Sequence, residues 1–316
     1  MNEKIWDALT VGELNVDLLL NEIDSFPEMG KEKLADKMDL TLGSSSAIFA
    51  SNLSSLGAKV AFCGKIGKDG FGDLVVESLN NKGVETDTII RDENLNTGIT
   101  VILNYDEDRA MVTHPGAMNY LTLSDVTEEM MNKAKHLHFS SFFLQPGMKD
   151  GVAEMFEKAK RLGLSTSLDP QWDPAEEWDF DFKNILPNVD VFLPNEVELL
   201  SLTKAQSIKE GIEKLKPFVN LLVVKRGNKG SLLYSNGELN EAPPFLNTNV
   251  VDAIGAGDSF DAGFILKFIQ GAAAVECQKF GNLTGAVNTT AAGGTGAFDD
   301  FKTVMQIAKE KFSYGE

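Results

Sequence analysis

The sequence predicts an α/β fold, in which a doubly wound, mostly parallel β-sheet is flanked by helices. Apolar runs of strand length alternate with segments of helical periodicity along most of the chain. Glycines follow two of the helical segments, at Gly57 and Gly83, where they favour a helix end. Because strands that alternate with helices build parallel sheets, we expect one layer of strands between two layers of helices.

The expected elements follow in chain order from the two periodicities. The first strand ends at Gly12, and the second helix carries Leu74, Val75 and Leu79 on one face before it stops at Gly83. We expect strands at residues 5–11, 60–63, 136–139, 165–168, 191–193, 221–225 and 231–234, and helices at residues 45–56, 71–82, 149–162, 208–215, 259–270, 272–292 and 301–312.

Two extended segments, residues 17–42 and 98–114, interrupt this alternation. Within the second, two strand-like runs flank Asp106-Glu107-Asp108, which is typical of a hairpin turn. We expect the two segments to form a small separate sheet. The prediction is therefore one domain, residues 1–316, with an inserted β-sheet lid formed by about residues 13–42 and 97–116.

Composition restricts the partners of the protein. Its 29 Lys and Arg residues face 47 Asp and Glu residues, and this excess of negative charge excludes nucleic acid and anionic membranes as broad-surface partners. The N-terminal residues lack the basic start and apolar run of a signal peptide, so we expect a cytoplasmic protein. Cys63 and Cys277 lie in apolar surroundings and are expected to be reduced core residues.

The most informative motif is Gly255-Ala256-Gly257-Asp258, directly before an apolar helix. Glycines let the backbone approach a ligand closely, and the helix start adds the positive end of its dipole, so the site favours an anion. Asp258 could then take the proton of a hydroxyl that attacks a phosphate. The alternative is that Asp258 only caps the helix.

Two common phosphate-binding motifs are missing from the sequence. It contains no Gly-x-x-x-x-Gly-Lys-Ser/Thr loop, and the first strand leads into residues 12–17 without a Gly-x-Gly-x-x-Gly fingerprint. A nucleotide would therefore be bound by another design.

The ordered motifs of the chain resemble the ribokinase-like (PfkB) family of carbohydrate kinases. The stretch from Asp252 to Phe260 is similar to the second signature of that family. Other matching elements, in the same order between Val11 and about Ala297, are Asn15-Val-Asp17 and residues 56–58, 64–72, 194–198 and 225–230. The resemblance implies that ATP lies across the C-terminal ends of the main sheet. It also implies that a β-sheet lid covers the sugar and joins two copies in a homodimer.

The resemblance also implies individual roles around the transferred phosphate. Asp258 would be the base, while the N–H groups of Gly255, Ala256 and Gly257 would form the anion hole. Asn195 and Glu198 would arrange Mg²⁺ and the phosphates, with Glu198 acting through water; alternatively they only cap a helix. The remaining implied residues are Lys225, Gly227, Gly230 and Asn282 for the nucleotide, and Asp252 and Ile254 for a monovalent cation such as K⁺.

For the sugar, the resemblance implies that Asn15 and Asp17 bind hydroxyls, together with Gly43, Ser44 and Ser45. The first signature of the family usually begins with two glycines and has an asparagine a few residues on. Here Ser44 replaces the second glycine and Ile48 replaces the asparagine, so no particular sugar is implied. The serines at residues 44–46 either bind sugar hydroxyls or cap the helix.

Two other groups of residues are assigned to structure. His114 lies in a loop near the expected sugar site, where a single histidine is more often structural. The aromatic residues near Asp169-Pro170, at positions 172, 178, 180 and 182, are expected to pack in the interior. Both assignments can be checked by position and exposure.

These observations predict an ATP-dependent, Mg²⁺-requiring kinase for a small sugar, such as fructose, ribose or 2-keto-3-deoxygluconate. Two alternatives stay open. A nucleoside kinase would use an apolar surround for a base, for which Ile48, Phe142 and Phe143 are available. A non-catalytic sugar-binding regulator would have no need for the proton acceptor Asp258.

Overall fold

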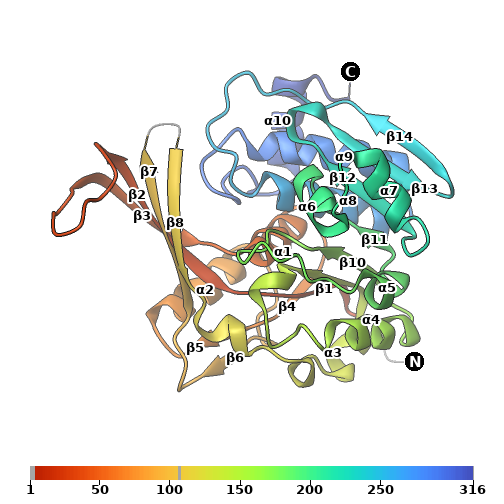
Figure 1. Cartoon of the computed structure of the whole chain (residues 1–316), viewed down its shortest axis with the longest axis horizontal. Coiled ribbons are helices and arrows are strands. Elements are labelled where there is room, and N and C mark those ends of the chain that lie inside the picture. Colours follow the sequence, from red (N-terminus) through yellow and green to blue (C-terminus); the bar gives the residue numbers. More distant parts are fainter. Residues whose placement is uncertain (1–3, 106–107, 316) are drawn as a thin grey trace.

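A sheet of eight strands lies at the centre of the part that the computed structural model describes, residues 4–105 and 108–315 (Figure 1). Its strands are β1 (Trp6–Val11), β4 (Val60–Cys63), β9 (Ala134–Ser140), β10 (Ser165–Asp169), β11 (Val191–Phe192), β12 (Leu221–Lys225), β13 (Ser231–Ser235) and β14 (Glu238–Ala242). They are arranged in the order β14-β13-β12-β11-β10-β9-β1-β4. The strands from β12 to β4 pair in parallel, and the β13–β14 hairpin adds an antiparallel edge. The predicted doubly wound sheet is confirmed.

Helices cover both faces of this sheet, and each face has its own apolar core. One layer consists of α1 (Ser45–Ser55), α2 (Gly70–Asn81), α8 (Ala256–Ile269), α9 (Ala274–Asn288) and α10 (Phe301–Phe312). The opposite layer consists of α3 (Glu128–Asn132), α4 (Val152–Arg161), α5 (Phe182–Ile185), α6 (Glu196–Thr203) and α7 (Ile208–Leu215). Phe62 packs into the first core and Phe139 into the second, and burying each such ring contributes about 1.5–3 kcal/mol.

The two extended segments form a separate four-stranded sheet that projects from the main body (Figure 1). Its strands are β2 (Asn15–Ile23), β3 (Ala35–Leu42), β7 (Gly98–Tyr105) and β8 (Asp108–His114), in the order β3-β2-β7-β8. This confirms the predicted lid sheet. In the predicted turn, Asp106 and Glu107 lie outside the described residues.

Smaller features differ from the prediction or complete it. A short parallel pair, β5 (Lys65–Gly67) and β6 (Ile90–Asp92), was not expected, because three-residue strands leave no periodicity to detect. Cys63 and Cys277 are buried free thiols, as predicted. None of the helices in the described ranges combines the length and apolar character needed to cross a membrane.

Two histidines of β9, His136 and His138, are buried in the central sheet. The ring of His136 bonds with the hydroxyls of Ser165 and Ser167 at 2.8 and 2.7 Å. Burial lowers the pKa of His136 to about 3 and that of His138 well below its usual value. Both rings are therefore neutral at pH 7.

Replacing His136 with Asn should make stability less dependent on pH. Below about pH 6.5 an unfolded histidine gains a proton, whereas folded His136 stays neutral down to about pH 3. The free energy of unfolding should therefore fall as the pH drops below 6.5, by up to about 1.4 kcal/mol per pH unit for this residue. Urea titrations across the acid range should show a shallower loss in the variant; equal pH dependence in both proteins would contradict this.

Candidate active site

One cavity of about 730 Å³ lies where the carboxyl ends of the parallel strands meet the start of α8. Residues that follow β1, β10 and β11 line it, together with Lys225 at the end of β12. The lid contributes one face of its sheet, because Asp17, Thr100 and Thr113 pair side by side across β2, β7 and β8 and all line the cavity. The cavity thus extends from the lid to α9.

The start of α8 has a tight glycine turn at the predicted anion hole. Gly255 caps the helix with a φ of 74°, and a Cβ there would lie 2.6 Å from the Cα of Gly294. Glycine is therefore required by both conformation and space. Gly255, Ala256, Gly257 and Asp258 all line the cavity, so the structure brings the predicted anion hole and base together.

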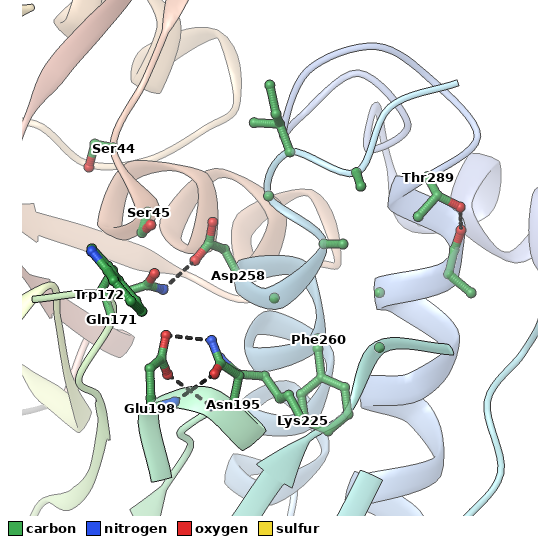
Figure 2. Close-up of a pocket in the computed structure, with 18 of the residues that line it drawn as sticks. Ser44, Ser45, Gln171, Trp172, Asn195, Glu198, Lys225, Asp258, Phe260 and Thr289 are labelled. Carbon is green, nitrogen blue, oxygen red and sulfur yellow. Dashed lines mark hydrogen bonds between the residues drawn. The ribbon is translucent and has the colours of Figure 1, made fainter. Parts of the chain in front are cut away.

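Asp258 is only 7% exposed, and its environment raises its affinity for a proton. Burial raises the pKa of Asp258 to about 7, the Asp169 carboxylate adds to the rise, and Lys225 opposes it. The side-chain amide of Gln171 donates a hydrogen bond to Asp258 Oδ1 at 2.9 Å (Figure 2). A carboxyl group with a pKa near 7 is suited to general-base catalysis at neutral pH.

Lys225 connects β10, β12 and α8 through two buried ion pairs. Its Nζ lies 2.7 Å from Asp169 Oδ2 and 3.0 Å from Asp261 Oδ2. Burial opposes the charge, but these carboxylates outweigh it and raise the pKa of Lys225. Lys225 also lines the cavity, so its predicted contact with nucleotide would use an ammonium group that already has two partners.

Asn195 and Glu198 cap α6 and also line the cavity, so both predicted alternatives fit them. Asn195 N donates to Glu198 Oε2 at 2.8 Å, and Glu198 N donates to Asn195 Oδ1 at 2.9 Å. Burial raises the pKa of Glu198 to about 8, helped by the charge of Asp169 and opposed by Lys225. Figure 2 shows the pair on the opposite side of Gln171 from Ser45.

The predicted sugar residues gather at the lid end of the cavity. Asn15 Nδ2 donates to Asp17 Oδ1 at 3.2 Å and to Thr100 Oγ1 at 2.9 Å. Burial raises the pKa of Asp17 to about 6, opposed by the hydrogen bond from Asn15. Gly43 does not line the cavity; it lies behind these residues, where a Cβ would be 2.4 Å from Asp17 Oδ1.

The three serines at the start of α1 have different roles. Ser44 and Ser45 line the cavity, while Ser44 also caps the helix by accepting from Ala47 N at 2.9 Å. Ser46 is fully buried and bonds to Glu13, so it does not reach the cavity. Glu13, which sequence reasoning missed, lines the cavity, and burial raises its pKa. The visible signal was an acid two residues before Asn15.

The predicted nucleotide residues lie at the other end of the cavity. Gly227 and Gly230 line it on the turn between β12 and β13, and Asn282 of α9 lines it as well. Asn282 Nδ2 donates to Pro243 O at 3.1 Å. Phe245 lines the same end and gives it an apolar wall.

The predicted cation residues are joined by internal hydrogen bonds. The Asp252 carboxylate accepts the N–H groups of Ile254 and Gly293, each at 2.9 Å. Asn288 Nδ2 donates to Ile254 O at 2.6 Å. Ile254 lines the cavity, and K⁺ binding at this loop stays a prediction. The described ranges hold no group of three or more Asp, Glu, His or Cys side chains arranged for a metal.

Aromatic residues are placed differently from the prediction in one respect. Phe180 is buried as expected, but Trp172 is 46% exposed and lines the cavity, so its assignment to the interior was wrong. The reason is the turn after β10, where Gln171 takes a φ of 58° and Trp172 follows at the cavity. No periodicity in the sequence signals such a turn.

Residues proposed to surround a nucleoside base do not reach the cavity. Ile48 is buried against Gly294, and Phe142 is also buried. None of Ile48, Phe142 and Phe143 lines the cavity. His114 is exposed at the end of β8 and does not line it either.

Comparison with known proteins identifies the family. The model of the pfkB family carbohydrate kinases matches residues 7–300. The chain belongs to this pfkB family. As a pfkB kinase it is a phosphotransferase that acts on a sugar hydroxyl, in a family that uses ATP.

Individual pfkB relatives are moderately similar over most of their length. The chain is 28% identical to an uncharacterized sugar kinase of Archaeoglobus fulgidus over 74% of this chain and 92% of that protein. It is 28% identical to fructokinase-1 of Zea mays, over 85% and 88% respectively. Among solved structures, ribokinase of Thermotoga maritima is 26% identical with a TM-score of 0.84, over 96% of this chain and all of that one (100%).

Replacing Gly43 with Ala should impair the sugar end selectively. The new Cβ would collide with Asp17 Oδ1, so Asp17 or Asn15 must move. A lost hydrogen bond to a charged group costs about 1.5–3 kcal/mol, so kcat/KM for the sugar should fall about tenfold or more. The KM for ATP should change little.

The matched control is Gly70→Ala, because a Cβ at Gly70 would have no atom within 4 Å apart from its chain neighbours and the backbone of its own helix. Steady-state assays should find this control close to wild type. Equal effects of the two substitutions would remove Gly43 and Asp17 from the sugar site.

Proposed function

We propose that the protein is an ATP-dependent, Mg²⁺-requiring kinase that phosphorylates a hydroxyl of a small neutral sugar. The observation that carries this proposal is the position of Asp258. It lies in the first turn of α8 beside the anion-binding glycines, in the same cavity as the hydroxyl-binding side chains of the lid.

The proposed reaction uses these groups in one step. Asp258 takes the proton of the sugar hydroxyl as its oxygen forms a bond to the γ-phosphorus of ATP. The bond between that phosphorus and the oxygen bridging to the β-phosphate breaks, and ADP leaves. The N–H groups at residues 255–257 and the α8 dipole stabilise the negative charge on the transferred group.

Mg²⁺ would be arranged by Asn195 and Glu198, whose oxygen atoms are the ligand type that it prefers. Mg²⁺ is usually held by one or two carboxylates, waters and substrate phosphates, so an extensive cluster of acids is not needed. When bound, it neutralises part of the phosphate charge. Its positive charge would also favour the ionised form of Glu198.

The charges at the lid end favour a neutral acceptor. Glu13, Asp17 and Asp258 line this region, while the basic residues of the described cavity wall are Lys225, already paired, and Arg226 at the nucleotide end. An acid or phosphate ester would meet carboxylates without a compensating cation. This supports fructose or ribose over 2-keto-3-deoxygluconate.

Substrate assays should follow this charge pattern. Four basic residues, Lys31, Lys33, Arg91 and Arg109, are candidates to offset the charge of a substrate, and three of them have other partners: Lys31 pairs with Glu28, Lys33 bonds to Ser25, and Arg91 pairs with Asp73. The fourth, Arg109, has a side chain outside the described residues.

A coupled assay across sugars and nucleosides should therefore find neutral sugars preferred over sugar acids and sugar phosphates. Fructose is the first sugar to test, because curated relatives include fructokinases. A sugar phosphate used with a kcat/KM about ten times that of every neutral sugar would refute this, because a site without a compensating cation should not favour the charged ester.

A nucleoside is the competing acceptor. Met111, Met118 and Trp172 give the lid end an apolar wall on which a base could lie. The same assay separates the two readings, because a nucleoside kinase would prefer adenosine or another nucleoside to every free sugar.

Replacing Asp258 with Asn should abolish turnover while binding survives. The N-cap of α8 is Gly255 and no side chain caps the helix, so an Asn of the same shape should keep the fold and the helix start, but its amide cannot accept the hydroxyl proton. General-base catalysis contributes about 10²–10⁴-fold, and kcat should fall by at least that range. Calorimetry should still detect Mg·ATP; a folded variant that keeps more than about a third of kcat would refute the role of Asp258.

The lid also supports the predicted homodimer. Its cavity-facing side is mostly polar near the main body, but its opposite side carries two apolar rows across the sheet. The rows are Leu40, Leu18, Val101 and Val112, and Met38, Leu20, Leu103 and Ala110. Val112 is 71% exposed and Met38 is 65% exposed, and a contiguous apolar face of this kind is typical of an interface.

Sedimentation velocity should find wild-type protein at twice the chain mass of 34.4 kDa. Val112→Asp places a charge on the apolar face and should shift the protein to the monomer. Val275→Asp is the control, because Val275 is similarly exposed (52%) on α9. A monomeric wild type, or a Val112→Asp protein that stays dimeric, would exclude this interface.

A further inference from the structure

We infer that Gln171 is a positioning residue for the catalytic base. Gln171 Nε2 donates to Asp258 Oδ1 at 2.9 Å and to Asp169 Oδ2 at 2.7 Å (Figure 2). One amide thus links the base to an acid that Lys225 holds in place. The inference rests on the proposed function and assigns a role in it to the turn after β10.

Gln171 combines these contacts with an unusual backbone conformation. Its φ of 58° is in the left-handed region, which is unfavourable for a residue with a side chain. Such a conformation persists when the surroundings determine it, and it is common at active sites. Here the two side-chain bonds and a third from Gln171 N to Asp169 Oδ1, at 3.3 Å, hold it.

The hydrogen bond makes the two oxygens of the base unequal. Oδ1 accepts from Gln171, so we assign Oδ2 as the oxygen that receives the proton of the acceptor hydroxyl, with the Ser45 hydroxyl also bonded to this carboxyl group. Figure 2 shows the Gln171 amide bonded to the lower oxygen of the Asp258 carboxyl group, with Ser45 above that amide. Gln171 thereby selects one orientation of Asp258 before the sugar arrives, which is the preorganisation that catalysis requires.

Gln171 also acts on the proton affinity of the base. A hydrogen bond donated to a carboxylate favours its charged form, so loss of the amide should raise the pKa of Asp258. The charged groups facing Asp258 are Asp169 on β10, Glu198 on α6, Lys225 on β12 and Glu13 after β1. A substitution of Gln171 removes none of these charges, so a shift in pH dependence reports on the hydrogen bonds of the amide to Asp258 and Asp169.

The test compares Gln171→Met with Gln171→Gly. Met keeps much of the length of the side chain but has no donor, and Gly removes the donor while it adopts positive φ freely. Both variants should lose kcat by about tenfold or more, with the acid limb of the pH–rate profile moved to higher pH. The KM for ATP should stay near wild type.

Glu176→Ala is the matched control. Glu176 lies in the same turn with a φ of 55°, but its side chain is exposed and does not line the cavity. It should keep the wild-type rate and pH profile. If the strained backbone alone mattered, Gln171→Gly would also keep them.

Retention of the wild-type rate and acid limb by either Gln171 variant would overturn the inference. If Gln171→Met fails to fold, Gln171→Gly decides alone, because glycine relieves the strain. A wild-type protein that phosphorylates no sugar or nucleoside would overturn the proposed function and this inference with it. With an active wild type, the variants report on Gln171 alone.

Discussion

The site depends on the buried ammonium group of Lys225. It joins Asp169 at the end of β10 to Asp261 on α8. It therefore fixes the helix that carries Asp258 against the carboxyl ends of the central strands. Removing one partner from a buried charged group costs about 3–5 kcal/mol, because the remaining charge is left without compensation. The alignment of Asp258 with the cavity therefore follows from this cluster.

The same cluster sets the electrostatics of the cavity. A single buried cation balances Asp169 and Asp261, and it only partly offsets the burial of Asp258 and Glu198. Both acids keep raised pKa values as a result, which suits a proton acceptor. In the proposed reaction, backbone N–H groups and the start of α8 would instead stabilise the transferred phosphate.

Much of the fold could be predicted because local pattern and tertiary structure agree. The alternation of strands and helices and the two extended segments predicted both sheets, and the glycine motif predicted the helix start at Gly255. Gln171 and Trp172 could not be placed, since their position depends on a turn with positive φ that no periodicity marks. Ile48 was misjudged for a similar reason, because only the packing against Gly294 shows that it lies behind the site.

The most direct test of this account is the pH dependence of kcat/KM for the neutral sugar that the protein uses best. In the free enzyme Asp258 has a pKa of about 7 because of its burial and the charge of Asp169. The profile should therefore show an acid limb with an apparent pKa near this value, and a ¹³C NMR titration of the Asp258 carboxyl group should follow it. A rate that stays constant down to the ordinary range of an aspartate, about pH 4, would contradict the account.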